Sequence, residues 1–445
     1  MAPTNCFDAC DGACSAHAVG RWVRREQPPP YRLDGGLYKL AGMKTTAVSA
    51  AHYGRCDDVS PSPRALYDWK PDGCALEPFS PSASCAAMRG RQLLFAGDST
   101  IWQLFLSFVL LHGGRLGRNA GHISTASELT ASLCGDGVRA VFVRTDLLLW
   151  TTHHWEYTMA RRADTTIKGA AFVQRALDAD LVVFGIGHHL PRVMDRLNKL
   201  GAPEDWPKRD AFFARNLNHT LSRALRMRAA RGRDPASLVL VGATIPVSGC
   251  SRFGEPISLA ASVGTAAEAA PRNQYTSRWQ AMPVYNQVAH WLARSAGARF
   301  VDVAAPSAQR PDAAMARFQP NAGAMDEDCL HFCLPGPVDT WSQLLFNLWS
   351  RPALQQRIAN GGAEPGSGRW FAVNATKWVG ERASAHHMEG CRRSGTCIDA
   401  VVSREWWWPF VNLSAHRPRT DGAPNAKAAG RKSYGVPARA AGGLS

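Results

Sequence analysis

A short polar turn, Gly97-Asp98-Ser99, separates two apolar runs in the stretch LLFAGDSTIWQLFLSFVLL (residues 93–111). The run before the turn has the composition of a buried strand, and the run after it predicts a helix over 100–111. A serine where a helix begins lies beside backbone N–H groups and a partial positive charge, and both would stabilise an oxyanion. Ser99 is therefore a candidate nucleophile, which needs a base and an orienting acid from elsewhere in the chain. The alternative is a polar turn that happens to contain serine.

A candidate base and acid stand far along the chain, in DEDCLHFCLPGPVDTW (residues 326–341). Asp328 and His331 are three residues apart, so on one turn both side chains lie on the same side. The carboxylate can then hold the imidazole in one tautomer while the other ring nitrogen faces the serine. Cys329 and Cys333 flank the histidine, and disulfides would fix such a loop. An isolated Asp-x-x-His pair is more often a solvated turn, but here the two motifs lie at opposite ends of one predicted unit.

Between these motifs, apolar runs of strand length alternate with helical patterns, which predicts an α/β fold with a parallel sheet and helices on both faces. Ligands of such sheets bind at the carboxyl ends of the strands, and Ser99 directly follows its strand. Strands are expected at residues 91–97, 138–145, 180–187, 237–244 and 298–303, and helices at 100–111, 170–179, 210–232, 284–297 and 337–349.

Composition divides the chain into four segments. Residues 1–90 are rich in Cys, Pro, Gly and aromatic residues and predict a loop-rich segment stapled by disulfides. Residues 91–350 carry the alternating pattern of the catalytic domain. Residues 351–416 are expected to form an irregular extension with Trp and Cys, and residues 417–445 a disordered basic tail.

The cysteine content favours an oxidising compartment. Twelve cysteines are scattered without the paired spacing of zinc modules, so disulfides are the better interpretation. Sequons at Asn218, Asn374 and Asn412 agree with passage through the secretory pathway. The N-terminus has no apolar signal core, and no apolar stretch is long enough to span a membrane. We therefore expect that a targeting signal, and any membrane association, resides in a segment not visible in this sequence.

The chain is basic, with a net charge of +15, and contains 15 tryptophans. Positive charge favours polyanionic partners, and exposed tryptophans can stack on sugars, so an acidic glycan is one hypothesis. Zinc-finger, RNP and zipper patterns are missing, and nucleic acid is not an expected partner. Histidine pairs at 153–154, 188–189 and 386–387 lack carboxylates at ligand spacing, so we expect neither a metal nor another cofactor. The sequence does not indicate an oligomeric state.

The two motifs together resemble the SGNH (GDSL-type) hydrolase superfamily, which has GDS after a strand near its start and DxxH near its end. More narrowly, DCLHFCLPGPVDTW (residues 328–341) resembles the DCxHWCLPGxPDTW pattern of the plant trichome-birefringence-like and PC-esterase family. The stretches CSAHAVGRWV (14–23), YDWKPDGCAL (67–76), LVVFGIGH (181–188) and FVDVAAPSAQRPDA (300–313) also fit this family, so the resemblance covers about residues 14–350. It implies a three-layer SGNH-hydrolase-like fold with a Cys-rich N-terminal segment. It also implies acetyl transfer to or from cell-wall polysaccharides, usually in the Golgi.

Carried over to this chain, the resemblance makes Ser99 the nucleophile, His331 the base and Asp328 the residue that orients the base. Asp98 belongs to the GDS motif rather than to the triad, and His188, at the family's GHW position, would line the site. The chain also departs from the family pattern. Arg-Asn-Gln after GDS is replaced by Trp102-Gln103-Leu104, an Asn by Gly185, two Trp by His189-Leu190, and a His by Ala313.

These departures remove the usual side chain of the oxyanion hole. The oxyanion would then be held by the backbone N–H groups of Ser99 and of Gly185 or Gly187, with Gly97 and Asp98 in the turn beside them.

The sequence thus favours a polysaccharide O-acetyltransferase of the Golgi lumen, which forms an acetyl-enzyme at Ser99 and passes the acetyl group from a donor to a cell-wall or extracellular glycan. An acetyl esterase with the same triad is the first alternative, because the sequence does not show whether water or a sugar hydroxyl reaches the acyl-enzyme. A catalytically silent glycan-binding protein of the same fold is the second, supported by the departures. A basic nucleic-acid binder is a distant third.

Overall fold

The computed structural model describes a set of residues that all lie in the first of two compact units, Met1–Val402. They are residues 20–28, 30–31, 63–72, 75–117, 128–148, 156–157, 166–167, 170–185, 187–191, 206–247, 249–259, 261–262, 281–315 and 328–350. The expected extension and tail, the histidine pairs at 153–154 and 386–387, and the sequons at Asn374 and Asn412 lie outside the described residues.

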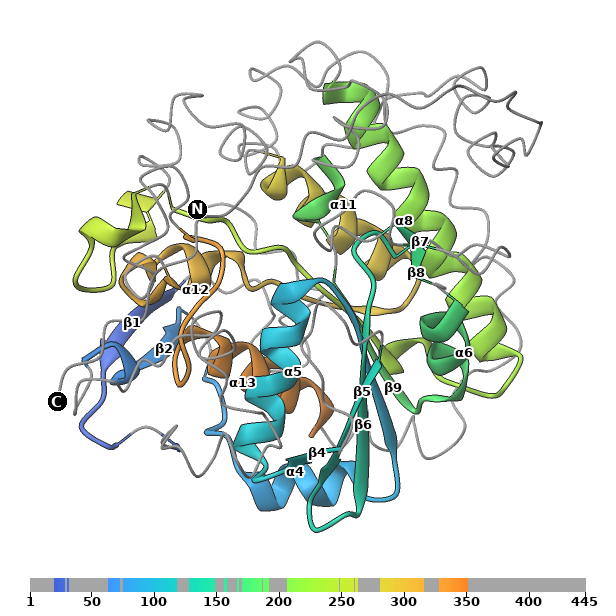
Figure 1. The fold of residues 1–445 in the computed structure, drawn as a ribbon, viewed down its shortest axis with the longest axis horizontal. Coiled ribbons are helices and arrows are strands. Elements are labelled where there is room, and N and C mark those ends of the chain that lie inside the picture. The colour runs from blue at the N-terminus through green and yellow to red at the C-terminus, as the bar shows by residue number, and fades with distance from the viewer. Residues whose placement is uncertain are drawn as a thin grey trace, which may run out of the picture. The chain divides into compact units, whose positions relative to one another are not determined.

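A seven-stranded sheet in the order β11-β10-β9-β3-β6-β5-β4 forms the centre of the fold (Figure 1). The strands from β11 to β6 are parallel, which confirms the predicted α/β class. At the other end of the sheet, β5 is antiparallel to β6, and the edge strand β4 is antiparallel to β5, a difference from the expected sheet. Only residues 134–137 connect β5 to β6, too few for the crossover that a parallel pair requires. The strands are β3 (Gln92–Gly97), β4 (Arg115–Leu116), β5 (Glu128–Leu133), β6 (Val138–Arg144), β9 (Leu181–Gly185), β10 (Leu238–Val241) and β11 (Arg299–Val301).

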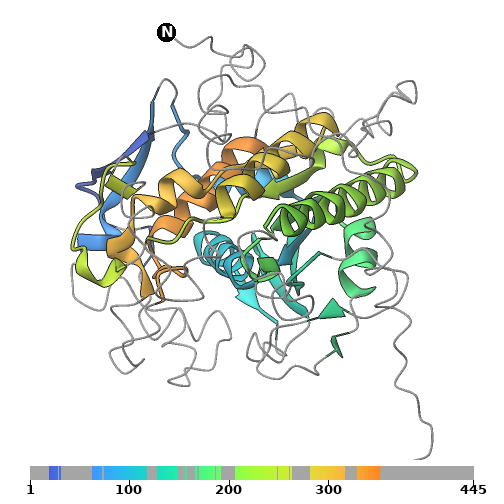
Figure 2. The same ribbon diagram turned by 90° about the horizontal axis from the view of Figure 1, so that it is seen from above.

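Helices cover both faces of the sheet (Figures 1 and 2). On one face, Phe95 and Phe142 of the sheet contact Phe105 of α5. On the other face, Phe184 of β9 contacts Phe172 of α6. Helices α5 (Ser99–Leu111) and α13 (Pro337–Trp349) pack together on the first face; α6 (Ala170–Asp178), α8 (Trp206–Ala229) and α11 (Met282–Ser295) lie on the second.

Helix α5 is buried along its whole length, from Thr100 to Leu111, which explains its nearly continuous apolar sequence. Asp98 caps its first turn by accepting hydrogen bonds from the backbone N and the hydroxyl of Thr100, at 2.9 and 2.6 Å. Gly97 and Gly185 lie side by side in β3 and β9. A Cβ atom on either would come within 2.5 Å of the Ile101 side chain, so these glycines let α5 approach the sheet closely.

The N-terminal segment, expected to be rich in loops, contains regular elements in its described part. β1 (Gly20–Arg24) and β2 (Tyr67–Pro71) form an antiparallel pair, and α4 (Pro81–Met88) precedes the central sheet. Buried Arg310 joins this pair to the domain, with its guanidinium 4.6 Å from the ring centre of Trp22 and 4.9 Å from that of Tyr67. The remaining elements are β7 (Glu156–Tyr157), β8 (Thr166–Ile167), α12 (Ala304–Ala308) and the 3-10 helices η1 (Pro63–Ala65), η3 (Pro235–Ser237), η4 (Cys250–Arg252) and η5 (Pro311–Ala313).

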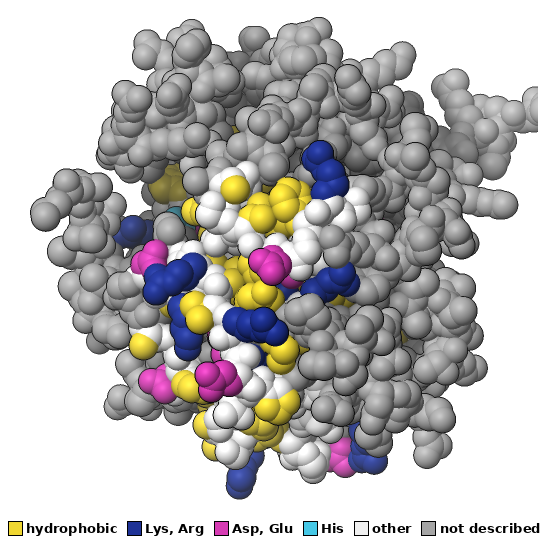
Figure 3. Space-filling model, turned by 90° about the vertical axis from the view of Figure 1, so that its left-hand side faces the viewer, with side chains coloured by type: hydrophobic (Ala, Val, Ile, Leu, Met, Phe, Trp, Pro, Cys, Tyr) yellow, Lys and Arg dark blue, Asp and Glu magenta, His cyan; other side chains and the backbone are white. Residues whose placement is uncertain are grey.

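Two further properties of the described residues are the length of their apolar helices and the distribution of charge on one face. None of the helices in the described ranges is both long and apolar enough to cross a membrane. On the face shown in Figure 3, basic, acidic and hydrophobic side chains are intermixed among the described residues. That face therefore lacks the continuous basic surface, at least over its described part, that a nucleic-acid backbone would require.

Candidate active site

The structure brings Ser99, His331 and Asp328 together in one hydrogen-bonded chain. The Oγ atom of Ser99 lies 2.7 Å from Nε2 of His331, and Nδ1 of His331 lies 2.8 Å from Oδ2 of Asp328. Ser99 begins α5, and the other two residues lie on the loop that leads into α13. The His331 and Asp328 side chains are 19% and 25% exposed, so neither is fully buried. This is the geometry that a nucleophile, a base and an orienting carboxylate require.

Burial and charge act in opposite directions on the His331 imidazole. Burial by itself would lower its pKa, but the charge and hydrogen bond of Asp328 outweigh burial, so the pKa lies above its ordinary value. Burial raises the pKa of the Asp328 carboxyl, but the charge of His331 and hydrogen bonds from the His331 side chain and from the backbone of His331 and Leu330 lower it further than burial raises it. Asp328 therefore stays ionised at neutral pH and can stabilise the imidazolium that forms when His331 takes a proton.

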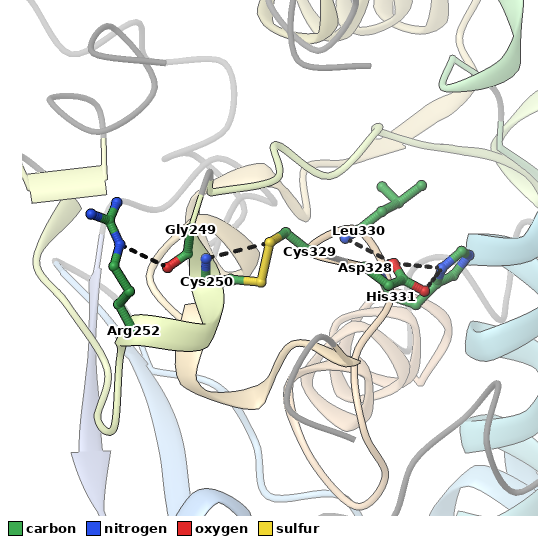
Figure 4. The surroundings of a disulfide bond; sticks show 7 residues. All are labelled: Gly249, Cys250, Arg252, Asp328, Cys329, Leu330 and His331. Atoms are coloured by element: carbon green, nitrogen blue, oxygen red, sulfur yellow. Dashed lines mark hydrogen bonds and ion pairs between the residues drawn. A yellow bond between two sulfur atoms is a disulfide. The ribbon is translucent and has the colours of Figure 1, made fainter. Parts of the chain in front are cut away.

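Backbone hydrogen bonds and a disulfide hold the loop that carries His331. The Oδ1 atom of Asp328 accepts from the backbone N of Leu330 and of His331, at 3.2 and 3.1 Å. Between these residues, Cys329 forms a disulfide with Cys250 of η4 (Figure 4). In that view the disulfide leaves the loop on the side away from the imidazole. Cys333 is also disulfide-bonded.

Removing the Cys250–Cys329 disulfide by replacing both cysteines with serine is expected to lower the free energy of unfolding by about 2–4 kcal/mol and kcat by about 10-fold or more. The loss of kcat follows because the disulfide fixes the loop between Asp328 and His331. The measurements are urea unfolding and steady-state release of alcohol from an activated acetyl ester.

The Cys85–Cys134 disulfide provides a matched control, because it joins α4 to the end of β5, away from this loop. Its sequence separation is 49 residues and that of Cys250–Cys329 is 79, a difference of only about 0.4 kcal/mol in loop entropy. We expect Cys85→Ser with Cys134→Ser to be destabilised similarly and to keep kcat. Equal losses of kcat in the two double variants would contradict the assigned role.

Asp98 and His188 are buried near Ser99 and are not part of the hydrogen-bonded chain of Ser99, His331 and Asp328. The Asp98 side chain is only 1% exposed, so it is out of reach of a substrate. Its Oδ2 atom lies 3.3 Å from Nδ1 of His188, whose Nε2 lies 3.0 Å from the backbone O of Thr244. Burial raises the pKa of Asp98, but the hydrogen bond and charge of His188 reverse this effect, and the pKa lies well below its usual range. An ionised Asp98 is the form that caps α5 and so fixes the backbone of Ser99.

The glycines expected near the oxyanion have a packing role in the described structure. Gly97 and Gly185 make room for Ile101, as described above. Gly187 has φ +148, and a Cβ atom there would lie 3.0 Å from that of Ala243. All three lie at the carboxyl edge of β3 and β9, beside Ser99, so the backbone N–H groups of Gly185 and Gly187 stay candidates for holding an oxyanion.

Sequence reasoning missed Arg144 and Asp146 at this edge, although it named His189. Buried Asp146 accepts from Nε of Arg144, at 2.9 Å, where β6 ends, and the charge of Arg144 lowers the pKa of His331. Burial lowers the pKa of His189, so this residue is neutral at physiological pH. The signal for Arg144 and Asp146 was available, since they lie at the carboxyl end of the strand predicted over residues 138–145, where ligands of parallel sheets bind.

Gln103 was noted in the sequence only as a departure from a family pattern. It is fully buried, and its side-chain amide bonds both backbone groups of Phe332, the residue after His331.

Among the described residues, no three His, Cys, Asp or Glu side chains lie together in a way that could hold a metal ion. His188 and His189, the described histidine pair, instead face Asp98 and Asp146.

Residues 76–348 match a sequence family described as PC-Esterase, a GDSL/SGNH-like acyl-esterase family found in Pmr5 and Cas1p. The match covers more than half of the chain and includes Ser99, Asp328 and His331.

Three plant proteins are similar to this chain. Probable xylan O-acetyltransferase 11 of Oryza sativa subsp. japonica is 27% identical over 66% of this chain and 79% of its own length. Xylan O-acetyltransferase 14 of the same plant is 23% identical over 75% of this chain and 77% of its own length. Protein trichome birefringence-like 42 of Arabidopsis thaliana is 21% identical over 74% of this chain and 87% of its own length.

Proposed function

The chain belongs to the PC-esterase family of GDSL/SGNH-like acyl-esterases, and from this premise we propose that it is a polysaccharide O-acetyltransferase that uses Ser99, His331 and Asp328. Membership confirms the family resemblance and the enzyme class expected from the sequence. The observation that carries the proposal is the 2.7 Å contact between the Ser99 hydroxyl and His331, within a family of GDSL/SGNH-like acyl-esterases. Relatives named xylan O-acetyltransferases favour transfer to a polysaccharide over hydrolysis.

The first half of the proposed reaction loads the acetyl group. Nε2 of His331 takes the proton from Ser99 as Oγ attacks the carbonyl carbon of an acetyl donor. Backbone N–H groups at the start of α5 and at Gly185 or Gly187 stabilise the oxyanion of the tetrahedral intermediate. The bond from the carbonyl carbon to the donor's leaving oxygen or sulfur breaks, that atom takes the proton from His331, and an acetyl ester stays on Ser99.

The second half repeats these steps with a sugar hydroxyl. His331 takes the proton of that hydroxyl as its oxygen attacks the acetyl carbon. The bond to Ser99 Oγ breaks, and the proton returns to the serine. An esterase differs only in using water at this stage, so the acceptor that reaches the acyl-enzyme decides between the two activities.

The experiment that tests the proposal follows the acetyl group. Purified protein and its Ser99→Ala variant are incubated with an activated acetyl ester, with and without wall oligosaccharides, and mass spectrometry measures acetate on protein, sugar and water. Acetylated sugar that depends on Ser99 would establish the transferase. Acetate release that is the same with and without sugar would make the protein an esterase. No turnover by the unmodified protein would favour the silent glycan-binding protein.

The proposed compartment is the oxidising lumen of the secretory pathway, in the Golgi. It is supported by the Cys85–Cys134 and Cys250–Cys329 disulfides, which would be reduced in the cytosol.

A further inference from the structure

The catalytic-loop residues 331–333 run as a short extended segment between two partners. On one side, residues 313–315 bond the loop backbone, since Met315 N donates to His331 O and Cys333 N donates to Ala313 O, both at 2.9 Å. In an extended chain the backbone groups of the residue between these two point the other way. Those groups belong to Phe332, and no strand lies there to receive them among the described residues.

The side chain of Gln103 occupies that place. Its Nε2 atom donates to the backbone O of Phe332 at 2.7 Å, and its Oε1 atom accepts from the backbone N of Phe332 at 3.2 Å. Gln103 is 0% exposed, so both hydrogen bonds are shielded from water. A primary amide offers one donor and one acceptor in the same plane, as a neighbouring strand would. Leu or Met of similar length offers neither.

The position of Gln103 on α5 links this clamp to the nucleophile. Ser99 and Gln103 are four residues apart on one helix, so they lie on the same face one turn apart. His331 and Phe332 are adjacent on the loop. The rigid turn of α5 thus holds Ser99 opposite His331 while it holds the next residue of the loop by its backbone.

We infer that Gln103 is a positioning residue, which sets the distance and angle between the Ser99 hydroxyl and the His331 imidazole by clamping the backbone of Phe332. This inference rests on the proposed function, because it assigns Ser99 and His331 to the reaction. The inference also gives a role to one of the residues that depart from the family pattern. In the triplet Trp102-Gln103-Leu104, the side-chain amide of Gln103 reaches the loop that carries His331.

The test compares three variants with the unmodified protein, using steady-state hydrolysis of an activated acetyl ester and thermal unfolding. Gln103→Leu removes both hydrogen bonds and is expected to lower kcat by about 10–100-fold with KM changed less than about three-fold. Gln103→Glu is expected to have activity that depends on pH in a new way. Its protonated carboxyl group can donate and accept as the amide does, whereas the ionised carboxylate only accepts and repels the Phe332 carbonyl oxygen.

The ratio of kcat in Gln103→Glu to kcat in the unmodified protein should therefore fall as pH rises. Titration of His331 and Asp328 on the loop, and of Asp339 at the start of α13, occurs in both proteins and so largely cancels in this ratio. A residue that only contributed stability would change the unfolding temperature and leave the ratio constant across pH.

Ser107→Ala is the matched control. Ser107 is also buried on α5, four residues beyond Gln103, and bonds Asp339 and Ser342 of α13 instead of the loop. We expect this variant to be less stable and to keep kcat. A Gln103→Leu variant that is folded at the assay temperature and keeps the unmodified kcat would overturn the inference, as would a kcat ratio of Gln103→Glu that does not change with pH.

A second readout separates this inference from the proposed function. If the unmodified protein shows no turnover that depends on Ser99, the proposed function fails, and the clamp is then tested by NMR of the His331 ring. A changed imidazole pKa in Gln103→Leu, absent in Ser107→Ala, would support the positioning role. Identical titration in all three proteins would overturn it.

Discussion

Replacing Ser99 by alanine is expected to lower the rate of acetyl transfer by about 10⁴-fold or more, while the protein keeps its fold. The rate falls because the hydroxyl that would carry the acetyl group is removed: Nε2 of His331 lies 2.7 Å from Ser99 Oγ. The fold persists because Asp98 and Thr100, not the Ser99 hydroxyl, make the capping hydrogen bonds of α5. Loss of one part-buried hydrogen bond should change the free energy of unfolding by only about 1 kcal/mol.

The measurements for Ser99→Ala are single-turnover mass spectrometry of the acetylated protein and urea unfolding. The unmodified protein should gain one acetyl group at Ser99 before sugar is added, and the variant should gain none. Acetylation of the variant at the same rate would place the nucleophile elsewhere and contradict the proposal.

Much of the fold could be predicted from the sequence because the buried strands and helices are long and apolar. The stretches that became β3, β6, β9 and β10 are runs of apolar residues covered on both faces by helices. β5 was missed although ELTASL alternates polar and apolar residues, the pattern of a half-buried strand, because only the continuous apolar runs were assigned as strands. β5 runs antiparallel to β6 because only residues 134–137 connect the two strands, and hydrophobic periodicity does not indicate the direction of a strand.

In the candidate site, the residues that the sequence indicated are recognised by their type, whereas those that it missed are defined by their contacts in the fold. Ser99, Asp328 and His331 were found because their chemistry needs those side chains at those spacings. Gln103 was not found, because it bonds the backbone of Phe332. Every residue type has these backbone groups, so the sequence does not indicate such a contact. The Cys250–Cys329 pairing was also beyond the sequence, because twelve cysteines can be paired in very many ways.

Two positions of the family pattern are explained by backbone rather than side-chain contacts. Ala313 stands where the family usually has histidine, and its carbonyl oxygen accepts from the backbone N of Cys333. Gly185 stands where the family usually has asparagine, and its missing side chain leaves room for Ile101 of α5. Departures at both positions are thus compatible with an ordered loop and an ordered nucleophile turn.

Asp328→Asn is expected to lower kcat by about 10³–10⁴-fold and to move the acid limb of the pH–rate profile to lower pH. The amide can keep an oxygen toward the backbone N atoms of Leu330 and His331, so the loop should stay ordered. Its other end, however, presents N–H to Nδ1 of His331, which favours the tautomer with the proton on Nε2. That tautomer cannot accept the proton of Ser99, and the imidazolium also loses its neighbouring charge.

The direction of the pH shift follows from what acts on His331. The reaction needs the neutral imidazole, so the rate rises with pH through the pKa of this group. In the unmodified protein Asp328 raises that pKa above its ordinary value, against the lowering effect of burial. Without the carboxylate, burial and the charge of Arg144 still lower the pKa, while the charge of Asp98 raises it.

In Asp328→Asn, kcat should therefore decrease and the acid limb should move to lower pH. This combination distinguishes a lost orienting carboxylate from general damage to the site. Steady-state kinetics between about pH 4 and 9 measure both quantities. Asp98→Asn is the comparison, because the Asp98 charge acts on His331 without hydrogen-bonding to it. It should shift the limb in the same direction by less. An acid limb that stays in place in Asp328→Asn would mean that a group other than His331 controls the profile, and the assignment of the base would have to change.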